Sequence, residues 1–184
     1  AFDDIPAQMA ATVPLSLTSS DGTGLKLVAL QGRAVIDDPL AFTELHLTFE
    51  NPEDRVLEGT FSIVLPQGAA ISRFAMKNDA GFQEGEVVEK KQARQVYEDF
   101  LHRKQDPALL EQAAGNEFSA RVFPIPARGR KELIVSYSQE RAKRRPYTLQ
   151  LKGMPEIGAV DVEAHVAGRA APVLSLAKQA LKPE

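Results

Sequence analysis

The amino-acid sequence predicts an all-β protein, an antiparallel β-sandwich with one inserted amphipathic α-helix at about residues 89–104. Two patterns predict the strands: apolar and polar residues alternate with period two in several short runs, and turn-forming residues separate these runs. One segment departs from this period and repeats its apolar residues at helical spacing. This combination is typical of a sandwich or barrel with a helix inserted between two strands.

The alternating runs predict strands that bury one face in a core and turn the other toward water. In residues 43–50, Leu45, Leu47 and Phe49 alternate with polar or charged neighbours. The same alternation involves Phe61, Ile63, Leu65, Leu133, Val135, Tyr137, Tyr147, Leu149, Leu151, Val160, Val162, Ala164 and Val166.

Turn signals lie between these runs at short, fairly even intervals. They contain residues that tolerate positive φ or that fix φ at the value a turn requires. The signals are Asp21-Gly22, Asn51-Pro52-Glu53-Asp54, Pro66-Gln67-Gly68, Asn78-Asp79-Ala80-Gly81 and Arg128-Gly129.

The predicted helix begins near Glu89 and ends near Lys104. An acidic residue at its start and basic residues at its end match the helix dipole. We expect its apolar face to pack on a sheet, because an isolated helix of this length is marginally stable. After it, Asp106-Pro107 predicts the start of a second short helix or turn that Gly115 ends. The apolar face of the first helix consists of Ala93, Val96, Tyr97, Phe100 and Leu101.

The basic and polar stretch 139–146 ends in a proline and is the expected boundary within the chain. We expect residues 13–141 to form one domain. Residues 142–184 are expected to add a β element and a linker toward a further domain. The strand-like runs 147–151 and 159–166 support the β element, whereas residues 170–184 lack alternation and predict a linker or short helix.

Composition restricts the classes of function. The 184 residues include 22 Lys and Arg against 25 Asp and Glu, which is too balanced for a nucleic-acid-binding face. The chain has no cysteine, so a disulfide framework and a cysteine zinc site are excluded. No apolar run approaches the roughly 18 residues that span a bilayer, so we expect no transmembrane segment.

The sequence contains no recognisable catalytic motif. A nucleophile elbow, a His-Glu-x-x-His pair and a phosphate-binding loop are all missing. Asp21-Gly22-Thr23-Gly24 contains the residue types of the aspartic protease motif in the wrong order, so a hairpin turn is the better interpretation. We therefore expect no enzymatic activity, no cofactor and no catalytic residues.

Candidate metal ligands are scattered rather than clustered. His46, His102 and His165 occupy polar positions, and no close spacing pairs them with further ligands as a zinc site requires. The acidic pairs Asp3-Asp4 and Asp37-Asp38 lack the alternating acids of a calcium loop. We expect solvated side chains at these positions and no metal site.

Basic residues form the strongest alternative site. Arg128, Arg130, Lys131, Arg141, Lys143, Arg144 and Arg145 lie within eighteen positions. Such a cluster is either a polyanion contact, for a glycan or phospholipid headgroup, or a pair of solvated strand ends.

The middle of the chain resembles the VIT (vault protein inter-alpha-trypsin) domain family over six ordered segments. The segments with this resemblance are Phe49-Glu50-Asn51-Pro52, residues 58–66 and 71–76, residues 85–97, residues 108–111, and residues 118–126 with 132–137. The positions matching the family motif are Pro66, Glu89, Ala93, Tyr97, Leu110, Glu111, Phe118, Val122, Pro124, Ile125 and Tyr137.

We expect these motif residues to be structural. For Glu89 and Glu111, a general acid/base pair is the alternative, but no nucleophile accompanies them. The resemblance implies a β-sandwich domain that commonly precedes a von Willebrand A domain in secreted or exported proteins. The Asp-x-Ser-x-Ser metal signature of that second domain is absent from these residues.

The function we expect is therefore non-enzymatic protein–protein interaction or scaffolding, linked to adhesion or assembly. The partner is another protein or a neighbouring von Willebrand A domain, and the location is secreted, periplasmic or in the cell envelope. Two alternatives remain: an accessory domain that positions a catalytic neighbour, and a polyanion-binding module.

Overall fold

The computed structural model describes residues 14–66, 68–90, 115–140, 149, 154–168 and 174–179, and this part of the chain contains strands and no helix. The strands are β1 (Leu15–Ser19), β2 (Lys26–Asp37), β3 (Leu40–Glu50), β4 (Leu57–Pro66), β5 (Ala70–Asn78), β6 (Gly81–Glu84), β7 (Val88–Lys90), β8 (Gly115–Ile125), β9 (Arg130–Glu140), β10 (Ala159–Val166) and β11 (Leu174–Gln179).

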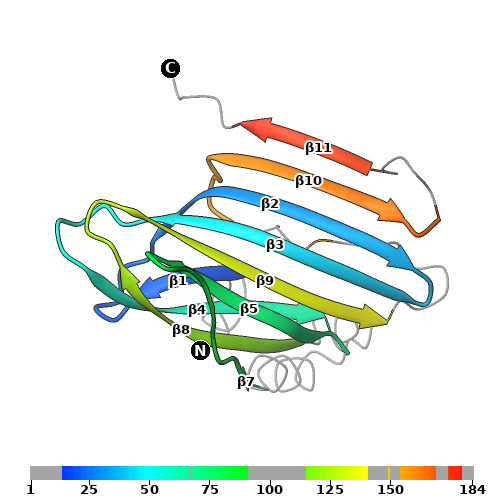
Figure 1. The fold of residues 1–184 in the computed structure, drawn as a ribbon, viewed down its shortest axis with the longest axis horizontal. Coiled ribbons are helices and arrows are strands. Elements are labelled where there is room, and N and C mark those ends of the chain that lie inside the picture. The colour runs from blue at the N-terminus through cyan, green and yellow to red at the C-terminus, as the bar shows by residue number, and fades with distance from the viewer. Residues whose placement is uncertain are drawn as a thin grey trace, which may run out of the picture.

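The strands form two sheets, which confirms the all-β prediction (Figure 1). A four-stranded sheet has the order β1-β4-β8-β7, and a seven-stranded sheet has the order β11-β10-β2-β3-β9-β5-β6. The prediction of a wholly antiparallel structure is wrong at one position, because β10 pairs with β2 in parallel. A parallel pair needs a long connection, and β10 follows β2 by more than a hundred residues in the chain.

One hydrophobic core joins the two sheets. Phe61 of β4 belongs to the four-stranded sheet, and its ring stacks on Phe74 of β5 in the other sheet at a centroid distance of 5.7 Å. The ring of Phe49 in β3 meets the ring of Phe61 edge-on, at a centroid distance of 6.3 Å. All three rings are buried. The alternation in these strands therefore directs each apolar face toward the opposite sheet, as period two requires.

The predicted helix does not begin at Glu89. Residues Val88–Lys90 form β7, in which Glu89 pairs with Phe118 of β8. The pairing of this short segment with the edge of β8 overrides its local helical pattern, as tertiary context often does. The remainder of the predicted helix and the second turn at Asp106-Pro107 lie outside the described residues.

The C-terminal part of the chain extends the larger sheet. The run 159–166 forms β10, which lies between β2 and β11. The expected linker or short helix in residues 170–184 is wrong where β11 forms, because Leu174–Gln179 pairs with β10 along the sheet. Gly158 precedes β10 at a point where a Cβ atom would come within 2.4 Å of the carbonyl oxygen of Val28, so only glycine fits there. Leu149, Met154 and Ile157 pack against the core. Apart from Leu149, the run 147–151 lies outside the described residues.

Replacing Phe61 with alanine tests the shared core. The variant should lose about 3–5 kcal/mol of unfolding free energy, because it removes a ring held between two others and leaves a cavity between the sheets. Urea titration monitored by circular dichroism measures this loss. Phe123→Ala is the matched control, since that ring is 50% exposed, and it should cost about 1 kcal/mol or less. Equal losses in the two variants would contradict the shared core.

Candidate interaction surface at the three-loop end

Three connections meet at one end of the sheets: residues 20–25 between β1 and β2, residues 51–56 between β3 and β4, and residues 126–129 between β8 and β9. We call this surface the three-loop end. The first and second loops meet through Arg55 and Asp21, whose ion pair is 2.5 Å long. The second and third meet where the amide of Arg128 donates to the carbonyl of Glu53 at 2.9 Å.

The side chain of Asn51 fixes the second loop against the third. It is 1% exposed, and its amide nitrogen donates to the carbonyls of Arg55 at 2.9 Å and Pro126 at 3.0 Å, with a longer contact to Ile125 at 3.5 Å. Its side-chain oxygen accepts from the amide of Glu53 at 2.9 Å. A side-chain amide is suited to this role because it carries both donors and an acceptor in one plane.

Asn51 also bonds through its backbone. Its amide donates to the carbonyl of Gly129 at 2.9 Å, which continues the pairing of β3 with β9 into the loops. Because the polar groups are buried, each lost bond would leave a donor or acceptor unsatisfied. We call this set of bonds the Asn51 clamp.

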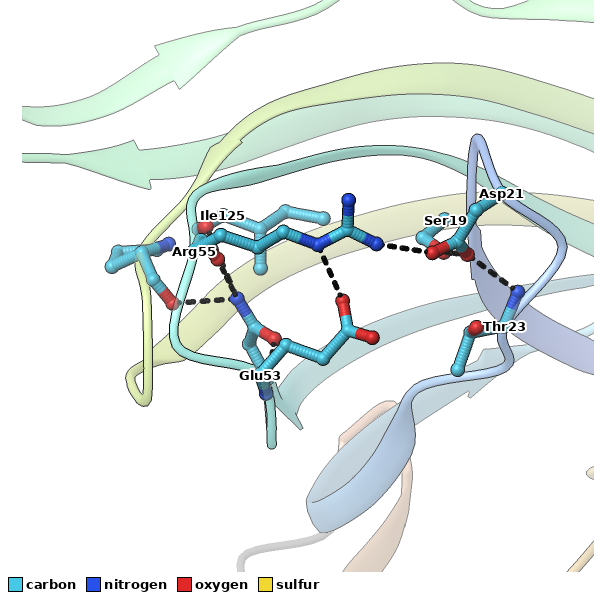
Figure 2. Close-up of polar contacts among 8 residues, drawn as sticks. Ser19, Asp21, Thr23, Glu53, Arg55 and Ile125 are labelled. Atoms are coloured by element: carbon cyan, nitrogen blue, oxygen red, sulfur yellow. Dashed lines mark hydrogen bonds and ion pairs between the residues drawn. The ribbon is translucent and has the colours of Figure 1, made fainter.

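Arg55 links two acidic side chains across the surface. Figure 2 shows its guanidinium extended between Glu53 and Asp21, with an Nε–Oε2 distance of 3.0 Å to Glu53. The hydrogen bond that Arg55 donates to the carboxylate of Glu53 is the main cause that raises the pKa of Arg55. All three side chains are partly exposed, so the pairs orient the loops more than they stabilise the fold.

The segment Asp21-Gly22-Thr23-Gly24 forms a turn, as the sequence predicts. The amide of Gly22 donates to the carbonyl of Ser19 at 2.9 Å, and Gly22 has a φ of 93°. Asp21 accepts hydrogen bonds from the hydroxyl of Ser19 and from the amide of Thr23. The Ser19 hydroxyl is the main cause that lowers the pKa of Asp21, followed by Thr23.

Exposed side chains surround this ordered centre. Val56 is 56% exposed, and the Asp54 side chain extends into solvent. Arg128 adopts a left-handed φ of 54°, and its Nε lies 3.8 Å from Oδ1 of Asp54. The three-loop end therefore presents one apolar and several charged groups on a fixed backbone, which is suited to contact with another protein.

The three predicted basic residues that the structure describes, Arg128, Arg130 and Lys131, do not form one continuous surface. Arg130 lies 3.8 Å from Glu50, and Arg128 pairs with Asp54 as described above. Lys131 is only 2% exposed, so its assignment to a polyanion contact is wrong. The remaining predicted residues, Arg141, Lys143, Arg144 and Arg145, lie outside the described residues.

The position of Lys131 in β9 explains its burial. It shares the inward face with Leu133, and its ammonium group reaches the carbonyl of Lys77 at 2.8 Å and Oδ1 of Asn78 at 2.6 Å. Burial lowers the pKa of Lys131, and the nearby Asp79 opposes this shift. Lys131 therefore holds the β5–β6 turn against β9.

The candidate metal ligands remain apart in the part of the chain that the structure describes. His46 lies 3.4 Å from Glu44, and His165 lies 3.3 Å from Glu163. No group of three or more His, Asp or Glu side chains in these ranges converges on a metal-sized site. His102 and the pair Asp3-Asp4 lie outside the described residues.

The structure places the family-motif residues in several environments. Phe118, Val122, Ile125 and Tyr137 are buried between the sheets. Pro66 ends β4, Pro124 follows a cis peptide bond in β8, Glu89 lies in β7, and Ala93, Tyr97, Leu110 and Glu111 lie outside the described residues.

Sequence reasoning did not identify Asn51 or Arg55 as site residues. Asn51 is part of the Phe49-Glu50-Asn51-Pro52 segment, where the sequence pattern predicts only a turn. Its partner Ile125 is 74 positions away along the chain, so local patterns contain no signal for the clamp.

Replacing Asn51 with alanine tests the clamp. Asn51→Ala should lower the unfolding free energy by about 3 kcal/mol, because buried carbonyls and an amide lose their partners. Chemical denaturation followed by fluorescence or circular dichroism measures the change. Asp54→Ala, in the same loop, is the control, and its effect should remain within about 0.5 kcal/mol. A variant at Asn51 as stable as this control would refute the clamp.

No helix in the described ranges is long and apolar enough to cross a membrane.

The comparisons with solved structures give weak similarities. A candidate nutrient-binding protein from Legionella pneumophila is 12% identical with a TM-score of 0.47, over 83% of this chain and 52% of that chain. An M1 zinc metallopeptidase from Deinococcus radiodurans is 12% identical with a TM-score of 0.41, over 79% of this chain and 33% of that chain. These values assign no activity.

Sequence comparisons are more informative. The chain is 27% identical to mouse inter alpha-trypsin inhibitor heavy chain 4 over 144 residues, which is 77% of this chain and 15% of the mouse protein. The family model described as the vault protein inter-alpha-trypsin domain matches residues 27–137, which include the second and third loops of the three-loop end. The chain therefore belongs to the VIT (vault protein inter-alpha-trypsin) domain family.

Proposed function

We propose that this chain is a non-enzymatic interaction domain that holds a partner protein or a neighbouring domain at its three-loop end. Membership of the VIT family supports this proposal, as does the similarity to an inter-alpha-trypsin inhibitor heavy chain. The role is adhesion or assembly within a larger protein that is secreted, periplasmic or located in the cell envelope.

The Asn51 clamp is the observation that carries the proposal. It fixes the backbone of two loops through a side chain that is itself buried, while Val56, Asp54 and Arg128 remain exposed around it. A surface that is ordered before binding loses less conformational entropy when a partner arrives. Contacts made by exposed side chains on such a surface therefore lose less binding free energy to the ordering of the loops.

We assign residues 13–141 to the VIT domain and residues 142–184 to an added β element with a linker. The pairing of β10 with β2 supports the β element, since these strands continue the sheet of the domain. A von Willebrand A domain is the neighbour that the family resemblance suggests. The mouse relative has room for further domains, because the match covers 15% of its length.

A polyanion-binding role has less support. Arg128 and Arg130 face acidic side chains of the same chain, and Lys131 is buried. An accessory role beside a catalytic neighbour uses the same contacts as the proposed function. The identity of the captured neighbour distinguishes the two.

Site-specific photo-crosslinking tests the proposal. A benzoylphenylalanine placed at position 56 in the full protein, expressed in its source cells, should form an adduct of defined mass on irradiation. Its mass spectrum should identify one partner or neighbouring domain, and the added substitution Arg128→Ala should weaken the adduct several-fold. The reason is that Arg128 contacts Glu53 and Asp54 in the loop that also contains Val56.

Position 88 provides the matched control. Val88 is also an exposed valine, at 59%, but it lies in β7 on the edge of the four-stranded sheet. The same probe there should give no adduct of that mass. Equal crosslinking from positions 56 and 88, or none from position 56, would overturn the proposal.

A further inference from the structure

The outward face of the seven-stranded sheet carries a group of exposed apolar side chains. Val35 of β2 and Phe42 of β3 are 43% and 46% exposed, and Leu40 follows the same outward alternation as Phe42. Their sequence neighbours Ala34 and Ala41 are buried on the opposite face. Phe42 is therefore held rigidly in a strand while its ring remains in water, which favours contact with another surface.

The register of β2 and β3 arranges this face as two matching columns. Val35 pairs with Phe42, and Arg33 pairs with Glu44 in the next outward row. Each row thus pairs groups that attract each other. Val35 and Phe42 are both apolar, and Arg33 and Glu44 carry opposite charges. Residues directly opposite each other in a sheet project from the same face.

We propose that this face binds a second copy of the same chain about a two-fold axis that runs along the strands between β2 and β3. Such an axis exchanges the two columns, so that β2 of one copy lies over β3 of the other. Phe42 then covers Val35 of the second copy, and Glu44 meets Arg33 of the second copy. The surface is self-complementary, as a two-fold interface requires.

The charges on this face favour a second copy over an unrelated partner. Arg33 lies 3.4 Å from Glu163 and Glu44 lies 3.4 Å from His46, so basic and acidic groups alternate instead of forming a field of one sign. A face of one sign would repel its own copy. The Arg33 side chain is 71% exposed, so its guanidinium is accessible to a second carboxylate.

A small-molecule ligand fits this face poorly. Its hollow, between His46, Phe82 and Glu132, has a volume of about 160 Å³, well below that of ligand pockets. A sheet face with projecting side chains is instead suited to the face of another sheet. This inference is independent of the three-loop end, which involves different residues.

Sedimentation equilibrium with paired charge reversals tests the dimer. The unmodified chain should reach twice its mass of 20.1 kDa as its concentration rises. Arg33→Glu alone and Glu44→Arg alone should each weaken self-association about tenfold or more, because like charges then face each other across the axis. An equimolar mixture of the two variants should regain the doubled mass, since every contact across the axis is again between opposite charges.

The mixture separates an interface from an effect within one chain. A charge reversal that only disturbs Glu163 or His46 of its own chain cannot be corrected by a second variant in another chain. Phe42→Ser should also weaken the dimer, whereas Phe123→Ser, an exposed phenylalanine on the other sheet, should not. Thermal unfolding confirms that each variant is folded. A monomer at all concentrations, or a mixture of folded variants that stays monomeric, would overturn the proposal.

Discussion

The buried side chain of Asn51 is the interaction on which the three-loop end depends. The loop after β3 and the loop after β8 both cross from one sheet to the other, and the Asn51 side chain adds a bridge between them to the bonds of the paired strands β3–β9 and β4–β8. The amide of Asn51 provides that bridge by bonding carbonyls of its own loop and of the β8–β9 loop. Since an unpaired carbonyl is costly in a buried position, these bonds favour the observed arrangement of the loops.

The two sheets provide the rigid base for this clamp. Rings from β3, β4 and β5 meet in the shared core, so the sheets are fixed to each other behind the loops. The larger sheet continues past β2 through β10 and β11, while its outward face over β2 and β3 remains available. The molecule thus offers two separate surfaces, an end formed by loops and a sheet face formed by strands.

Sequence patterns predicted β3, β4, β9 and β10, because the side chains of these strands alternate locally. They did not predict the start of β7 or the parallel direction of β10, since both depend on strands that are distant in the chain. Lys131 was grouped with its basic neighbours in sequence, although alternation already placed it on the buried face with Leu133. Asn51 carried no local signal, because its bonds to the third loop form only in the folded chain.

Amide hydrogen exchange, measured residue by residue by NMR, tests the central claim most directly. The amides of Asn51 and Glu53 donate within the Asn51 clamp, and the amide of Arg128 donates beside it to the carbonyl of Glu53. If the clamp holds the loops, these amides exchange as slowly as those of the central strand β3, because they open only when the sheets separate. Exchange at the fast rate of exposed loop amides, with β3 still protected, would show that the three-loop end is not fixed and would contradict the account.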